Sequence, residues 1–145
     1  GSNVWFVDTS DPLEMAELGR WSTGGAELTG VSAETGRVVL ASLWGVVPGV
    51  GLDRSGLRVL DGSDPATSVE LGRAIISGQP WNMSVRSNLA YVANYHGGVH
   101  IVDISDPTNL HRIGRFDTPG EARGVSVSAD GSRRPGRTVP AGLRC

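Results

Sequence analysis

VHIVDISDPTNLHRIGRF, residues 99–116, is the stretch that decides the fold, because the chain contains two further versions of it. Residues 4–21 read VWFVDTSDPLEMAELGRW and residues 57–74 read LRVLDGSDPATSVELGRA. All three copies share Asp-x-Ser-Asp-Pro and then Gly-Arg, with the glycine eleven positions after the first aspartate. A repeat of this kind indicates a fold made of similar units, each packed against its neighbours.

The spacing of the copies predicts the size of the unit. Their first aspartates, Asp8, Asp61 and Asp103, lie 53 and 42 residues apart. A period near 42 residues is typical of a four-stranded propeller blade, and an insertion at residues 45–56 accounts for the longer interval. Runs such as VHIV are apolar at nearly every position, which predicts strands covered on both faces. No segment has a sustained helical period.

Composition excludes several classes of protein. The 145 residues include 39% hydrophobic and 19% charged residues, and no apolar run is long enough for a membrane span. The net charge of −2 gives no electrostatic attraction to nucleic acid. All thirteen basic residues are arginine, which suggests a GC-rich bacterial gene, and Cys145 is the only cysteine.

The segment AYVANYHGGVHIVDISDPTNLHRIGRFDTPGEARGVSVSADG, residues 90–131, resembles the LVIVD repeat family of bacterial and archaeal surface-associated proteins. The resemblance covers residues 1–132 and implies an all-β fold, a partial β-propeller of four-stranded antiparallel blades with about 42 residues each. It implies no enzymatic activity, no cofactor and a location outside the cytoplasm or at the cell surface. The expected blade parts are 1–22, 23–76, 77–118 and 119–132.

Two parts of the repeat are interpreted as structural. The Ser and Asp side chains of Asp-x-Ser-Asp-Pro can accept hydrogen bonds from nearby backbone N–H groups, and Pro presets a turn dihedral. We therefore expect a turn at the end of each third strand rather than a ring of cation-binding carboxylates. Gly-Arg falls in the fourth, outermost strand, where charge prevents edge-to-edge pairing. An arginine ring that binds a ligand is the less favoured interpretation.

Catalytic and metal sites are not expected. His96, His100 and His111 are the only histidines and do not have the spacing of a metal site. The sequence has no Gly-x-Ser-x-Gly elbow, no His-Glu-x-x-His and no phosphate-binding loop. We therefore assign no catalytic residue and no metal ligand.

The order of strands predicts where a binding surface would lie. In an up-and-down blade, the turns after strands one and three share one side of the disc, and those after strands two and four share the other. The second side collects irregular loops with aromatic and titratable residues, and such loops usually carry binding. Packing between blades is an equally good interpretation for any single aromatic. The candidate binding residues are Trp44, Trp81, Tyr95, His96, Glu27, Glu121 and Arg123.

These observations favour a non-enzymatic module that binds a protein or a small ligand. The alternatives are part of a propeller enzyme, of the hydrolase or lactonase type with a site at the central channel, and a purely structural spacer. Because the pattern starts at a third strand and stops within a blade, we expect a fragment of a longer propeller. Its partners would be the missing blades of the same chain or further copies.

The tail RRPGRTVPAGLRC, residues 133–145, departs from the repeat. A second strand should follow SADGS, but two prolines and four arginines stand there. Proline is excluded from central strands. We expect this tail to be disordered, either as a frameshift or truncation product or as an ordinary exposed terminus.

Overall fold

The chain folds into antiparallel β-sheets with almost no helix. The computed structural model describes residues 2–34, 36–43, 45–47, 51–53, 55–128 and 143–144, with only the backbone described at 45–47, 51–53 and 143–144. A hairpin comes first, formed by β1 (Asn3–Asp8) and β2 (Ala16–Ser22). No helix in the described part of the chain has the length and apolar character needed to cross a membrane. The all-β expectation is confirmed.

Two four-stranded sheets follow the hairpin. The first sheet contains β3 (Leu28–Glu34), β4 (Arg37–Ser42), β7 (Gly56–Asp61) and β8 (Glu70–Ile75) in that order. The second sheet contains β9 (Asn82–Arg86), β10 (Leu89–Ala93), β11 (Val99–Asp103) and β12 (His111–Phe116), also in chain order. Apart from the insertion between β4 and β7, each strand of a sheet therefore pairs with the next one along the chain, as the repeat predicts.

Two small hairpins and one helical turn complete the described structure. The insertion forms a small hairpin of β5 (Gly45–Val47) and β6 (Gly51–Asp53). A single 3-10 turn, η1 (Pro65–Thr67), follows β7. β13 (Ser126–Val127) pairs with β14 (Leu143–Arg144), and the remainder of the tail 133–145 lies outside the described residues.

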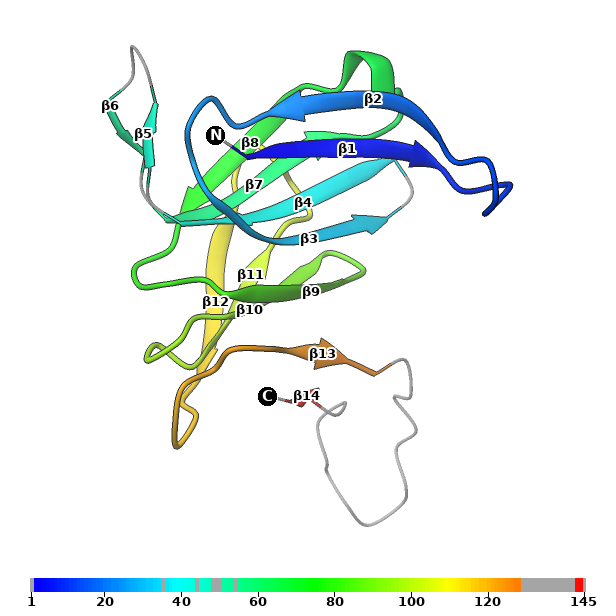
Figure 1. The fold of residues 1–145 in the computed structure, drawn as a ribbon. Coiled ribbons are helices and arrows are strands. Elements are labelled where there is room, and N and C mark those ends of the chain that lie inside the picture. Colours follow the sequence, from blue (N-terminus) through cyan, green and yellow to red (C-terminus); the bar gives the residue numbers. More distant parts are fainter. Residues whose placement is uncertain are drawn as a thin grey trace.

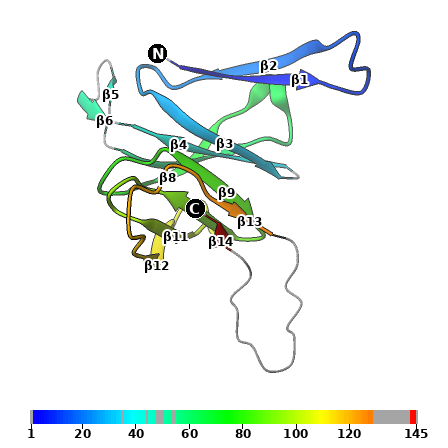
Figure 2. The ribbon, with the colours of Figure 1, turned by 60° about the horizontal axis from the view of Figure 1, so that its bottom comes forward.

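The hairpin and the two sheets lie one on another (Figures 1 and 2). The first strands of the two sheets, β3 and β9, are neighbours, and β9 also contacts β13. The largest apolar cluster joins β4 and β7 of the first sheet, through Val39 and Val59, to β10 and β11 of the second, through Val92 and Val102. A second cluster joins Val4 and its neighbours in the hairpin to the other face of the first sheet. Strand β7 is thus covered on both faces, as its apolar sequence predicts.

The Asp-x-Ser-Asp-Pro motifs form turns, which confirms their structural interpretation. β1, β7 and β11 end at Asp8, Asp61 and Asp103. The Oδ1 atom of each aspartate accepts a hydrogen bond from the backbone N–H of the serine two residues later: Ser10 at 2.8 Å, Ser63 at 2.9 Å and Ser105 at 2.8 Å. The second aspartate of each motif does the same: Asp11 with Leu13, Asp64 with Ala66 and Asp106 with Thr108.

The outermost strand of each unit carries a bulge just before Gly-Arg. The register of β1 with β2, β7 with β8 and β11 with β12 shifts at the same place in each repeat. The unpaired residues are Leu18, Leu71 and Ile113, which are 48%, 40% and 54% exposed. A bulge twists an edge strand and hinders pairing with another chain. The arginines that follow are also exposed, as the edge-strand interpretation requires.

The glycine of Gly-Arg touches the next unit along the chain. A Cβ placed on Gly19 would lie 2.0 Å from the carbonyl oxygen of Pro65, and one on Gly72 would lie 1.7 Å from that of Pro107. Any side chain at these two positions would therefore overlap with the backbone of the following Asp-x-Ser-Asp-Pro turn. The two motifs of the repeat are the two sides of one contact between neighbouring units.

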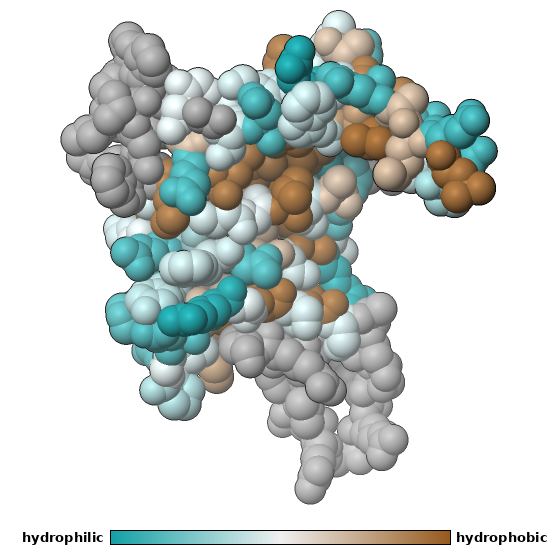
Figure 3. All heavy atoms as spheres, in the orientation of Figure 1, coloured by the Kyte–Doolittle hydropathy of each residue, from teal (hydrophilic) through white to brown (hydrophobic). Residues whose placement is uncertain are grey.

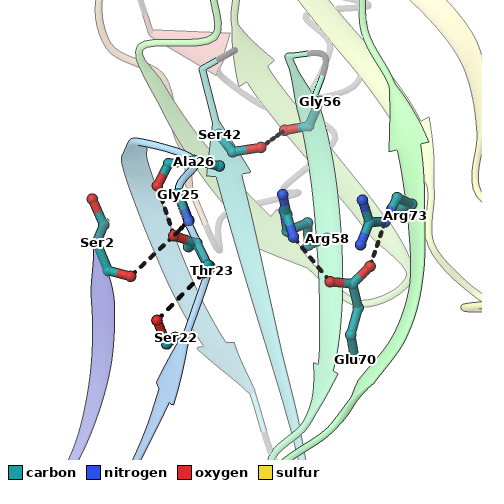
Figure 4. Close-up of polar contacts among 11 residues, drawn as sticks. Ser2, Ser22, Thr23, Gly25, Ala26, Ser42, Gly56, Arg58, Glu70 and Arg73 are labelled. Carbon is teal, nitrogen blue, oxygen red and sulfur yellow. Dashed lines mark hydrogen bonds and ion pairs between the residues drawn. The ribbon is translucent and has the colours of Figure 1, made fainter. Parts of the chain in front are cut away.

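Polar side chains also fix the first sheet and the hairpin (Figure 4). The buried Thr23 hydroxyl donates to the carbonyl of Ala26 at 2.7 Å and accepts from the backbone N–H of Gly25 at 3.3 Å. At the β7–β8 edge of the same sheet, the Glu70 carboxylate binds Arg58 at 3.1 Å and Arg73 at 2.6 Å. Because Arg58 is 4% exposed, its charge needs this carboxylate close by.

Candidate binding surface

Three loops of the second sheet meet at one side of the stack. They are residues 76–81 before β9, 94–98 between β10 and β11, and 117–125 after β12, and they lie at the left of Figure 1. The backbone groups of Tyr95 and Ala122 exchange two hydrogen bonds of 2.9 Å, and the Trp81 N–H donates to the carbonyl of Ala93 at 2.9 Å. The Asp-x-Ser-Asp-Pro turns lie at the opposite side of the molecule. The loops that follow the second and fourth strands of a unit thus form a surface that is separate from the turns.

Two aromatic rings and one guanidinium form the centre of this surface. The ring centroids of Trp81 and Tyr95 are 5.8 Å apart with the planes tilted by 34°. The guanidinium carbon of Arg123 lies 5.9 Å from the Trp81 centroid and 5.6 Å from the Tyr95 centroid. At these distances the cation is attracted by the ring faces. Trp81 remains 44% exposed, so the cluster is not simply part of the core.

A carboxylate neutralises the arginine and reaches a histidine. Glu121 binds Arg123 at 2.7 Å, and its other oxygen lies 4.0 Å from Nε2 of His96. Hydrogen bonding from Tyr95, and then from Arg123, holds the pKa of Glu121 below its ordinary value. The carboxylate is therefore ionised at neutral pH. We refer to Trp81, Tyr95, His96, Glu121 and Arg123 as the Trp81 surface.

The backbone of Tyr95 adopts an uncommon conformation. Its φ is 49°, in the left-handed region that residues other than glycine rarely occupy. The two hydrogen bonds with Ala122 and the bond from the Gly98 N–H to the Tyr95 carbonyl, at 3.3 Å, hold it there. Such conformations are concentrated at functional positions, where the surrounding structure compensates their cost.

A buried asparagine supports the loops from below. Asn94 is 1% exposed, and its Nδ2 donates to the carbonyl of Ser77 at 2.7 Å and lies 3.3 Å from His100. It therefore connects the loop before β9 with the loop after β10. A Cβ on Gly78 or Gly97 would lie 2.6 Å from the same amide, so glycine is needed at both positions. Burial, and then the charges of Arg112 and Arg115, lower the pKa of His100, which is only 3% exposed.

The structure brings together five of the seven residues that the sequence suggested as a binding side. These five are the Trp81 surface. Glu27 lies in the loop between β2 and β3, where its carbonyl accepts from the N–H of Leu43 at 2.8 Å, and no described contact joins it to the Trp81 surface. Trp44 lies outside the described residues.

Sequence reasoning missed the supporting role of Asn94. The signal was available in NYHGG, residues 94–98, because two adjacent glycines after a strand indicate a backbone that must pass close to another group. The partner at Ser77 belongs to a different loop, and the sequence alone does not connect the two.

The described side chains of the Trp81 surface include several of the kinds found at protein interfaces. The His96 side chain is 76% exposed. Within the described residues, no three His, Cys, Asp or Glu side chains are arranged to hold a metal ion. Exposed Trp, Tyr and Arg side chains are the residues that dominate the energetics of protein interfaces.

Comparison with known proteins agrees with the repeat. Residues 77–118, which include the whole second sheet and the loop that carries Trp81, match the family model of the LVIVD repeat. No curated protein and no solved structure gives a significant match to the chain.

Proposed function

We propose that this chain, in which residues 77–118 are an LVIVD repeat, is a β-propeller repeat module that binds a protein partner through the Trp81 surface. The stacked four-stranded antiparallel sheets and the neighbouring first strands β3, β9 and β13 support the propeller architecture. The resemblance to bacterial and archaeal surface-associated proteins supports a place at the cell surface or in a secreted protein. The module acts by binding and not by catalysis.

The observation that carries the proposal is the exposed Trp81 ring beside Tyr95 and Arg123. An exposed Trp that packs on one side against Tyr and Arg presents a large, rigid contact area, so little conformational entropy is lost on binding. Asn94 and the Tyr95–Ala122 backbone bonds hold the rings in place before binding. Glu121 already neutralises Arg123, so the surface does not need a charged partner.

The experiment selects peptides from a phage-displayed random library on the immobilised chain and measures their affinity for two double variants. Trp81→Ala with Arg123→Ala removes the centre of the Trp81 surface. Leu13→Ala with Met15→Ala is the matched control, since these side chains are 92% and 64% exposed on the Asp-x-Ser-Asp-Pro side. We expect the first double variant to weaken binding at least about tenfold and the control to leave it unchanged. An equal loss of peptide affinity in both double variants, or a loss of affinity only in the control, would contradict the proposal.

The hydrolase alternative makes a different prediction. His96 and Glu121 lie 4.0 Å apart on the same surface, and a histidine beside a carboxylate is the arrangement of a general base. Turnover of ester or lactone probes that is lost in His96→Gln, without any change in peptide binding, would favour the enzyme.

A further inference from the structure

A groove lies between the two four-stranded sheets, at their outermost strands. Residues 73–76, at the end of β8, form one wall, and Val102 of β11 forms the other together with residues 110–112 at the start of β12. The volume of the groove is about 400 Å³, within the range of pockets that hold small organic molecules. Both walls belong to sheets that have all four strands, so the groove is a feature of the contact between two whole units.

The floor of the groove is apolar. Ile76 and Val102 belong to the large cluster that joins the two sheets, and Leu110 packs against that cluster. Figure 3 shows that apolar side chains, in brown, also gather at the outer end of the hairpin, where Leu13 and Met15 are exposed. An apolar surface alone therefore does not identify a binding site. The informative feature of the groove is the charged side chain that stands beside its floor.

This side chain differs between the repeats in the sign of its charge. The ninth residue after the first aspartate is Glu17 in the hairpin, Glu70 in the first sheet and Arg112 in the second. Arg112 lies opposite Val102 in the register of β11 with β12. Residues that lie opposite each other in an antiparallel pair share one face of the sheet. Arg112 is therefore on the face that packs against the first sheet, and it lines the groove.

In the first two units, the glutamate at this position lies close to the arginine of Gly-Arg. A carboxylate oxygen of Glu17 is 3.9 Å from Nε of Arg20 in the hairpin. Glu70 binds Arg73 at 2.6 Å and the buried Arg58 at 3.1 Å, so that one carboxylate joins two guanidinium groups (Figure 4). A carboxylate beside the cations is thus a regular part of these two units.

The second sheet has cations at the equivalent positions but lacks this carboxylate. The residues that take the places of the three ion-paired residues in the first sheet are His100, Arg112 and Arg115. Arg115 pairs with Asp117 at 2.5 Å. Among the described side chains, no acidic group forms an ion pair with Arg112. Burial, and then the charges of Arg112 and Arg115, lower the pKa of His100, so the histidine is neutral at neutral pH.

We propose that this groove binds a small organic carboxylate with an apolar chain, whose carboxylate pairs with Arg112 and whose chain covers Ile76 and Leu110. The ligand would supply the negative charge that Glu70 supplies in the first sheet. A guanidinium can donate two parallel hydrogen bonds to one carboxylate, which favours this kind of anion. The apolar chain would displace water from the floor of the groove. The groove shares no lining residue with the Trp81 surface, so the two sites are independent.

The experiment titrates octanoate into the full, isotope-labelled chain and follows the backbone amides by two-dimensional NMR. We expect saturable binding at a single site with a dissociation constant below about 1 mM, and the largest shifts at residues 73–76 and 110–112. Octanamide has the chain of octanoate without its charge, and acetate has the charge without the chain. Because the groove recognises both parts, each of these two compounds should bind at least about tenfold more weakly than octanoate.

Two variants test the two halves of the groove. Arg112→Glu gives the second sheet the carboxylate that the other units have, within reach of Arg115. It should abolish octanoate binding without lowering the melting temperature of the unliganded chain. Ala74→Leu fills the groove from its other wall and should weaken octanoate binding at least about tenfold with Arg112 intact. Arg123→Gln removes an exposed guanidinium from the Trp81 surface and is the control, which should bind octanoate as the wild type does.

Circular dichroism and thermal melting establish that each variant is folded, and Arg112→Gln replaces Arg112→Glu if the latter is not. Four results would each overturn the proposal: no saturable octanoate binding to the wild-type chain, octanamide binding as strong as that of octanoate, amide shifts confined to the loops 94–98 and 119–124, or octanoate affinity unchanged in the Arg112 variant. None of these results bears on peptide binding at the Trp81 surface.

Discussion

Gly72 of the first sheet lies directly against the carbonyl oxygen of Pro107 in the second sheet, so closely that a Cβ would be 1.7 Å from it. Because the obstacle is backbone, it cannot move aside as a flexible side chain would. The same contact joins Gly19 to Pro65, so the glycine of Gly-Arg in the first two copies lies against the Asp-x-Ser-Asp-Pro turn of the next copy.

Gly72→Ala should lower the free energy of unfolding by about 1–3 kcal/mol, because overpacking forces the two sheets apart. Chemical denaturation followed by circular dichroism measures the change. Gly120→Ala is the control, since its methyl group meets open space. Equal stability of the two variants would show that the Gly72–Pro107 contact does not hold the sheets together.

The Asp-x-Ser-Asp-Pro turns should make stability fall in acid. Hydrogen bonds from Ser63 and Ser105 lower the pKa of Asp61 and Asp103 in the folded chain. A carboxylate whose folded pKa lies below its unfolded value of about 3.9 contributes stability that is complete above the unfolded value and is lost as the pH falls through the folded one. The melting temperature should therefore decrease between about pH 5 and pH 2.

Asp61→Asn with Asp103→Asn tests the origin of that decrease. The amide oxygen can still accept the turn hydrogen bond, but it carries no charge that acid can remove. The double variant should show a weaker dependence of melting temperature on acid pH, and Glu14→Gln, which removes an exposed carboxylate, should retain the wild-type dependence. An unchanged pH profile in the Asp variant would assign the acid sensitivity to other groups.

Asn94→Ala should destabilise the chain and loosen the Trp81 surface. The change removes the hydrogen bond to the carbonyl of Ser77 and leaves a small cavity where the buried amide was, and one such hydrogen bond contributes about 0.5–1.5 kcal/mol. Urea denaturation measures this loss, and the fluorescence anisotropy of the chain's tryptophans should fall as the Trp81 loop becomes more mobile. Asn109→Ala, at an exposed position, should change neither quantity. A fully stable Asn94→Ala chain would show that this amide does not support the loops.

The sequence predicted the parts of the fold that depend on local chemistry. Alternating and continuous apolar runs located the strands, and Asp, Ser and Pro located the turns. Both kinds of signal depend on interactions between residues that are close together in the sequence. The grouping of Trp81, Tyr95 and Glu121 was predictable because strand order decides at which side of a sheet each loop emerges.

Contacts between distant segments were not predictable in this way. Gly-Arg was interpreted through its arginine, as protection of an edge strand, whereas its glycine is required by a proline in the next unit. Asn94 appeared to be an ordinary loop residue, because its partner at Ser77 comes from another loop. Glu27 was grouped with the binding residues on loop position alone, and its described contacts are elsewhere.

The central claim is that the Trp81 surface is where a partner binds. Hydrogen–deuterium exchange of the chain, with and without a peptide selected on it, tests this claim most directly. The account predicts slower exchange of the amides at 94–98 and 119–124, where Tyr95 and Ala122 join the two loops, and unchanged exchange at the turns 8–12, 61–65 and 103–107. Slower exchange at those turns, with none at the loops, would contradict it.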